Sequence, residues 1–165
     1  MRGLRSIVGK GVSDYILLCN SYSFKFKKMK KVTGIGGIFF KSDDPEKMKK
    51  WYHKHLGLEI DTYGTNFEWR QGSNPKKKGF TQWSVNSKNA TYADSSDQQF
   101  MINYRVENLE EMVRQLKKEG VQFVDEIEEF DYGKFVHIID AEGNRVELWE
   151  PNDEEYDRIV EGRTK

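Results

Sequence analysis

The stretch DAEGNRVELWEP, residues 140–151, sets a single carboxylate where it could do chemistry. Its short EGN turn leads into alternating residue types, so Glu147 is expected on a strand between apolar neighbours. A carboxylate in that position can coordinate a metal ion, accept a proton as a base, or face solvent. His137, on the strand-like run before the turn, is the second candidate for proton transfer, with a buried structural histidine as the alternative.

The composition of the chain limits the classes of partner that it is expected to bind. The 165 residues suffice for one domain with its own core, and 27 basic side chains cancel 27 acidic ones. We therefore expect no nucleic acid or anionic membrane as partner, but a small-molecule ligand. No apolar run approaches the roughly 20 residues that cross a bilayer. Cys19 is the only cysteine, which predicts no disulfide and a reducing, cytoplasmic location.

The organised part of the chain begins at Val32 with a strand and a helix. The strand-like run GIGGIFF precedes a helix that Asp44 caps, that Pro45 begins and that Gly57 ends. Its apolar residues recur at helical spacing, which predicts a buried stripe with Trp51 in the core: Met48, Trp51, Tyr52 and Leu56.

A second copy of this pattern follows 64 residues later. Asn108 caps the second helix and Gly120 ends it, and the shift aligns Asp44 with Asn108. Each helix precedes three strand-like runs, at 58–64, 66–72 and 80–86 and at 121–127, 134–140 and 144–150. An internal duplication of a βαβββ unit is therefore predicted.

The domain boundaries follow from this repeat. The two modules are expected at 32–90 and 98–151, joined by a polar loop. Residues 1–31 are basic and rich in Ser and Gly, so we predict a poorly ordered extension, with Met29 as a second candidate start. Residues 152–165 are predicted as a charged tail or short helix in solvent, without chemistry.

The motifs resemble those of the vicinal oxygen chelate superfamily, which includes glyoxalase I, bleomycin resistance proteins and extradiol dioxygenases. The DP helix start, WYHKHLGL and DAEGNRVELWEP carry the resemblance, which covers residues 32–151. It implies an α+β fold of tandem βαβββ modules whose strands form an open cup, with the ligand site on the concave face. It also implies that a homodimer can form, since family members often pair modules between chains.

Side-chain alternation then predicts which residues face the cup, because strand residues two apart share a face. Glu147 and His137 are the predicted catalytic groups, and Trp149 is predicted to contact the ligand opposite Phe39. The predicted ligand-binding residues are Phe39, Glu68, Arg70, Gln82, Met101, Asn103, Arg105 and Trp149.

Metal binding is not expected, although the resemblance implies four ligand positions. They correspond to Gly37, Gln82, Met101 and Glu147. Only Glu147 is a strong donor there, whereas a divalent ion needs about three from His, Asp or Glu. No cofactor is therefore expected; if Zn, Ni, Mn or Fe binds, Glu147 and Gln82 are its predicted ligands. Without a metal, Glu147 could instead form an ion pair with Arg70 or Arg105.

Two functions fit these residues. The first is a binding module that holds a small molecule in the cup without metal, as bleomycin resistance relatives do. The second is a glyoxalase-like lyase or isomerase in which Glu147 is the base, while His137, Gln82 or an arginine stabilises an enolate-like anion.

Overall fold

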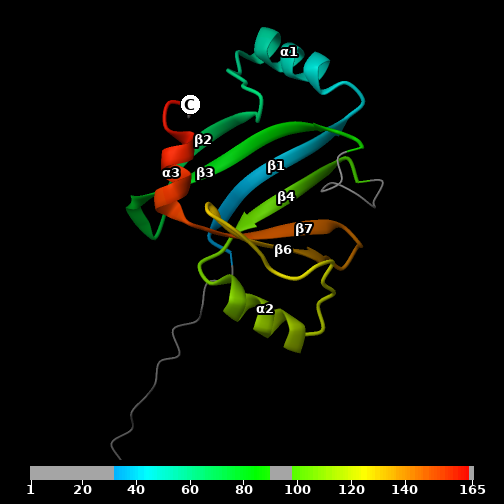
Figure 1. Ribbon diagram of the computed structural model, residues 1–165, viewed down its shortest axis with the longest axis vertical. Coiled ribbons are helices and arrows are strands. Elements are labelled where there is room, and N and C mark those ends of the chain that lie inside the picture. The colour runs from blue at the N-terminus through cyan, green and yellow to red at the C-terminus, as the bar shows by residue number, and fades with distance from the viewer. Residues whose placement is uncertain (1–31, 90–97, 164–165) are drawn as a thin grey trace, which may run out of the picture.

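The computed structural model describes residues 32–89 and 98–163, so the predicted N-terminal extension and Cys19 lie outside it. The sheet has seven strands in the order β2-β3-β1-β4-β7-β6-β5 (Figure 1). The strands are β1 Gly34–Ser42, β2 Thr65–Gln71, β3 Asn74–Ser87, β4 Phe100–Arg105, β5 Glu128–Phe130, β6 Gly133–Ile139 and β7 Arg145–Pro151. The helices are α1 Pro45–Leu56, α2 Leu109–Lys118 and α3 Asp153–Val160.

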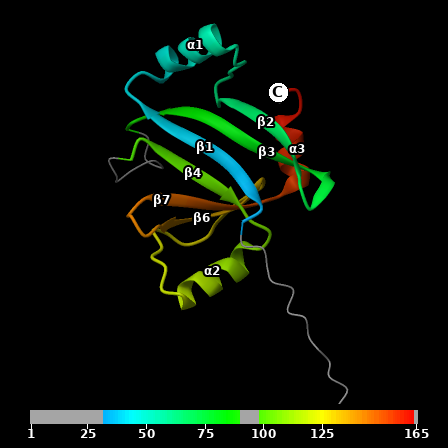
Figure 2. The same ribbon diagram turned by 180° about the vertical axis from the view of Figure 1, so that it is seen from behind.

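The duplication is confirmed by the topology. β1 pairs parallel with β3 in the first module, and β4 pairs parallel with β7 in the second. The modules join where β1 runs antiparallel to β4. The helix caps also correspond, because Asp44 accepts the Lys47 N–H and Asn108 accepts the Glu111 N–H. The predicted α+β cup is the observed fold, with α1 and α2 at opposite ends of the molecule (Figures 1 and 2).

Two predicted strands are absent from the described residues. Residues 58–64 and 121–127 contain only isolated bridges, Asp61 with Gly64 and Phe123 with Ile138. The carboxylate of Asp61 accepts the N–H groups of Tyr63 and Gly64, which folds the first segment into a turn. In the second module the first of the three strands that follow the helix is β5, which begins only at Glu128.

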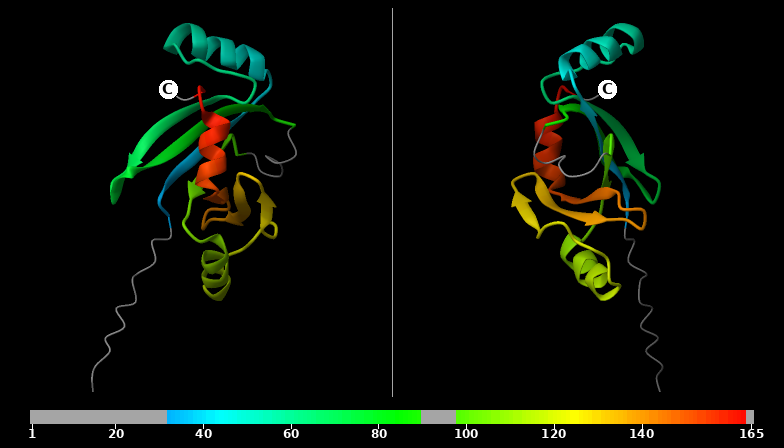
Figure 3. Two further views of the ribbon diagram at one scale, coloured as in Figure 1. Left: turned by 60° about the vertical axis from the view of Figure 1, so that its left-hand side comes forward. Right: turned by 90° about the vertical axis from the view of Figure 1, so that its right-hand side faces the viewer.

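The C-terminal segment forms the short helix α3, one of the two forms expected for it, but it packs into the molecule, so the expectation that it is solvated is wrong. Tyr156 and Val160 of α3 are buried against Phe80 and Trp149. These two residues lie four apart and so share one helix face, while the charged residues occupy the other faces. The many charged residues of this segment made the apolar spacing hard to recognise in the sequence. Figure 3 shows the strands curving away on either side of α3.

The main core lies between α2 and the second module's strands, and it contains Val106, Leu109, Met112, Val113, Val136 and Leu148. α1 makes no equivalent core, because Trp51 is 50% exposed and Leu56 is 60% exposed. The prediction of Trp51 as a core residue is therefore wrong; in its stripe Tyr52 packs on Trp83, with ring centroids 4.6 Å apart. None of the helices in the described ranges has the length and apolar character to span a membrane.

Candidate functional site

A cavity of about 280 Å³ lies on the concave side of the sheet, where the two modules meet. The first module contributes Gly36, Phe39 and Gln82 to its lining. The second module contributes polar residues and a wall of aromatic rings, and α3 contributes Tyr156. The volume is close to the lower end of the range for ligand pockets, about 300–1,000 Å³.

The polar floor of the cavity is a row of three side chains on neighbouring strands. Glu147 of β7 stands opposite Asn103 of β4 and opposite His137 of β6. Asn103 Nδ2 donates to Glu147 Oε2 at 2.5 Å, and His137 Nε2 lies 3.1 Å from Glu147 Oε1. All three residues are buried. Strand register therefore gives the carboxylate a partner at each oxygen.

Asp125 extends this row behind His137. Its carboxylate accepts the backbone N–H of His137 at 2.7 Å and lies 2.6 Å from Nδ1 of the imidazole. Burial lowers the pKa of His137, but the contact with Glu147, assisted by Asp125, outweighs it and raises the pKa above its usual value. The result is a chain of carboxylate, imidazole and carboxylate that reaches the cavity.

This raised pKa predicts a pH-dependent stability. A histidine with a folded pKa above its unfolded value of about 6.5 stabilises the fold fully below that pH. The contribution is lost as the pH rises through the folded pKa, by about 1.4 kcal/mol for each unit of difference. Urea denaturation from pH 6 to pH 9 should therefore show a falling difference in unfolding free energy between the natural protein and His137→Gln. The exposed His55→Gln variant is the control, and a constant difference for His137→Gln would contradict the ion pair.

The aromatic wall centres on Trp149, which is 3% exposed. Its ring stacks on Phe135 at 5.8 Å between centroids and meets Tyr156 edge-on at 4.7 Å. Burial raises the pKa of Tyr156 to about 12, so the phenol stays protonated. Its hydroxyl donates to Asn66 Oδ1 at 3.0 Å and approaches Gln82 Oε1 at 3.3 Å.

Six of the predicted site residues line this cavity: Phe39, Gln82, Asn103, His137, Glu147 and Trp149. Their role in binding or catalysis stays a prediction. Sequence reasoning missed Asp125 behind His137 and the other six lining residues: Gly36, Glu128, Phe130, Tyr132, Phe135 and Tyr156. A signal existed for Tyr156 in its spacing to Val160, whereas the loop residue Asp125 follows no strand alternation.

Four predicted ligand-binding residues do not line the cavity. Glu68 and Arg70 form an ion pair at 2.6 Å on β2, outside the lining. Arg105 is buried and pairs with Asp153 of α3, and its guanidinium lies 5.7 Å from the Trp149 ring centroid. Met101 is buried two residues before Asn103 without reaching the cavity.

The alternative prediction that Glu147 pairs with Arg70 or Arg105 is wrong. Both arginines have other carboxylate partners, and Glu147 contacts His137 and Asn103 instead.

The lining does not fit the divalent metal that the fold family implies. A register shift between Ile35 and Gly37 places Gly36 at the cavity, with no side chain to offer. The Gln82 amide donates to Tyr63 O at 3.0 Å, and Asn103 donates to Glu147. Within residues 32–89 and 98–163, no three His, Cys, Asp or Glu residues are grouped to hold an ion. Glu147 and Gln82 alone are too few donors.

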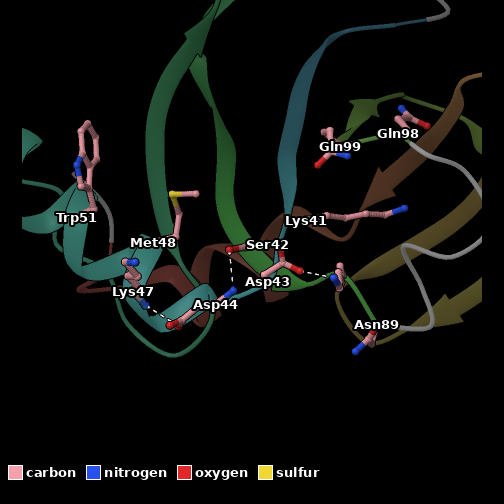
Figure 4. A pocket seen from close by; sticks show the side chains of 11 residues that line it. Lys41, Ser42, Asp43, Asp44, Lys47, Met48, Trp51, Asn89, Gln98 and Gln99 are labelled. Carbon is pink, nitrogen blue, oxygen red and sulfur yellow. Dashed lines mark hydrogen bonds and ion pairs between the residues drawn. The ribbon is translucent and has the colours of Figure 1, made fainter.

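A second, larger hollow of about 800 Å³ lies beside the start of α1 and carries fewer signs of a binding site. Figure 4 shows Asp44 turned back to the backbone of Lys47, as the helix cap requires. Asp43 pairs with Lys88 across the hollow. Most of its lining is exposed and none of the predicted site residues is part of it, so we take the cavity on the concave face as the site.

Comparison with known proteins agrees with this fold. A family model described as Glyoxalase/Bleomycin resistance protein/Dioxygenase superfamily matches residues 34–148. Among curated proteins, none matches the sequence significantly.

Solved structures of methylmalonyl-CoA epimerases are similar in fold. The enzyme from Mycobacterium tuberculosis is 23% identical with a TM-score of 0.53, and the match covers 77% of this chain and 93% of that one. A variant of the Streptomyces coelicolor enzyme in complex with 2-nitronate-propionyl-CoA is 13% identical with a TM-score of 0.55, over 73% and 99% of the two chains. At these identities the likeness shows the fold alone. Because the family model spans more than half of the chain, the protein belongs to the Glyoxalase/Bleomycin resistance protein/Dioxygenase superfamily.

Proposed function

We propose that this protein binds a small organic molecule in the cavity between its two modules, and that it does so without a divalent metal. The observation that carries the proposal is the organised interior of the cavity. An aromatic wall faces a polar floor in which Asn103, His137 and Glu147 are already held by one another. Apolar walls with a few fixed polar groups are typical of specific small-molecule sites.

The ligand need not be that of the structural neighbours. One neighbour holds 2-nitronate-propionyl-CoA, an anionic thioester. The lining of this cavity includes Glu128 and Glu147 but no lysine or arginine among the described residues. An anion would therefore meet two carboxylates, and His137, the lining residue that can carry positive charge, is already paired with Glu147.

Gly36 offers a direct test, because it lines the cavity at a point where an added side chain has no room. A Cβ at this position would lie 2.2 Å from Asn103 Oδ1 and 2.7 Å from Cε3 of Trp149. Gly36→Ala should therefore displace the floor and lower the affinity for cavity ligands at least about tenfold, or about 1.4 kcal/mol. Binding of benzyl alcohol, benzylamine and benzoate, followed by ligand-observed NMR, measures the effect.

The matched control is Gly72→Ala, where an added Cβ meets nothing within 4 Å. This variant should bind like the natural protein. The proposal is contradicted if none of the three probes binds the natural protein, or if Gly36→Ala binds them unchanged. Thermal melting of both variants separates lost binding from lost folding.

A lyase or isomerase with Glu147 as base is the second candidate, and the chain Asp125, His137 and Glu147 favours it. Such a chain can accept a proton at Glu147 and stabilise it through the imidazole. We place it second because both oxygens of Glu147 already have partners. Metal-independent exchange of solvent deuterium into the α-carbon of an added carbonyl compound, lost in Glu147→Gln, would favour it over simple binding.

A further inference from the structure

The aromatic wall forms a continuous set of ring faces and edges around one side of the cavity. Phe130 and Tyr132 stack at 5.4 Å between centroids, and Phe135 meets both edge-on. Phe135 in turn stacks on Trp149. Phe130 is 47% exposed and Tyr132 is 37% exposed. The inner rings are thus fixed in place, while the outer two have surface that a ligand can cover.

The charged side chains that line the cavity carry net negative charge, because Glu147 and Glu128 outnumber His137. Glu147 lies at its floor and Glu128 on β5 at its side, and the described lining has no lysine or arginine. His137 is the one lining residue that can gain positive charge, and it is shared with Asp125. Burial and the charges of Glu147 and Glu128 raise the pKa of Tyr132, so both carboxylates act on the same ring.

The polar floor of the cavity also contains a buried hydrogen-bond acceptor. Asn103 is 2% exposed, and its Nδ2 is committed to Glu147. Its Oδ1 has no hydrogen-bond partner among the residues that the structure describes. This oxygen lies close to Gly36, because a Cβ added there would come within 2.2 Å of it. A buried acceptor without a hydrogen-bond partner destabilises the protein, and a ligand that donates a hydrogen bond to it removes that cost.

We propose that the cavity takes an organic ammonium ion, a protonated amine that carries an aromatic or alkyl group. The hydrocarbon part lies on the aromatic wall, an N–H of the ammonium donates to Asn103 Oδ1, and Glu147 and Glu128 balance the charge. An ammonium at Asn103 Oδ1 also lies near the Trp149 ring, since both flank Gly36, and the quadrupole of an aromatic ring attracts cations most strongly away from water. This inference rests on the proposed function and names its ligand class.

Three probes of matched shape test the charge requirement: benzylamine as cation, benzyl alcohol as neutral molecule and benzoate as anion. Isothermal titration calorimetry at pH 7 and low salt should rank them in that order. We expect benzylamine to bind at least about tenfold more tightly than benzyl alcohol. Benzoate should bind most weakly, because it meets two carboxylates.

Two charge variants on β5 test whether the preference for a cation comes from the cavity lining. Glu128→Gln removes a lining carboxylate and should weaken benzylamine binding about threefold, as expected for a partly solvated ion pair, while benzyl alcohol binding is unchanged. Glu129→Gln removes the same charge from the next residue, which lies outside the cavity lining. It should leave both affinities unchanged. Both residues are exposed, so neither variant should impair folding.

The outcomes separate this inference from the function on which it rests. If benzyl alcohol or benzoate binds as tightly as benzylamine, and Gly36→Ala abolishes that binding, the cavity is a binding site but not one for ammonium ions. Equal effects of Glu128→Gln and Glu129→Gln would likewise overturn the inference. The general charge of the protein surface, and not a carboxylate of the cavity lining, would then explain the preference for a cation. If no probe binds, the proposed function fails together with it.

Discussion

Replacing Trp149 with alanine is expected to lower the free energy of unfolding by about 3–5 kcal/mol and to abolish binding in the cavity. The indole is 3% exposed, stacks on Phe135 and meets Tyr156 edge-on, so its removal leaves a large void between β7 and α3. The buried guanidinium of Arg105 would also lose the ring beneath it. Urea denaturation followed by circular dichroism measures the loss.

Trp51→Ala is the matched control for this prediction. Trp51 is 50% exposed on α1, so the same change should cost no more than about 0.5 kcal/mol and leave binding intact. A Trp149→Ala protein that loses less than about 1 kcal/mol would show that the ring does not hold this cluster together.

Tyr156→Ala is expected to destabilise the protein by about 3–5 kcal/mol, because it empties the face of α3 that closes the cavity. Tyr156 packs on Phe80 and Trp149, and its hydroxyl donates to the buried Asn66. Tyr156→Phe keeps the ring and loses that hydrogen bond, so it should cost only about 1–2 kcal/mol. The two variants together separate packing from hydrogen bonding, again by urea denaturation.

Ile159→Ala serves as control on the same helix, since this side chain is 38% exposed, and a loss below about 1 kcal/mol is expected. If Tyr156→Ala were no more harmful than Ile159→Ala, α3 would be the solvated tail that its charges suggested. Ligand-observed NMR on Tyr156→Ala should also show weaker probe binding, because one wall of the cavity is missing.

Features that depend on nearby residues could be predicted from the sequence. The helix caps at Asp44 and Asn108 and the repeated order of elements are local signals, and they were enough for the fold. The face of β7 also followed from alternation, which placed Glu147 and Trp149 in the cup, and both residues line the cavity. The predicted cytoplasmic location and homodimer stay predictions.

Features that depend on pairing between distant segments could not be predicted. The register shift between Ile35 and Gly37 arises from how β1 meets β4, and it places Gly36 at the cavity, where the resemblance had implied Gly37. Asp125 reaches His137 from a segment that sequence alone predicted as a strand. Arg105 was predicted on the cup-facing side of β4, but its partner came from α3, which had been expected in solvent.

The unequal packing of the two duplicated helices has a consequence for dynamics. None of the twelve residues of α1, all within the described range, is buried, whereas α2 buries Leu109, Met112 and Val113. Segments with little buried apolar surface open locally at a small fraction of the global unfolding free energy. Backbone amides of α1 should therefore exchange with solvent through local opening, while those of α2 exchange only when the core itself unfolds. The two helices, although similar in sequence pattern, thus belong to different cooperative units, and α1 can unfold and refold locally while the sheet stays folded.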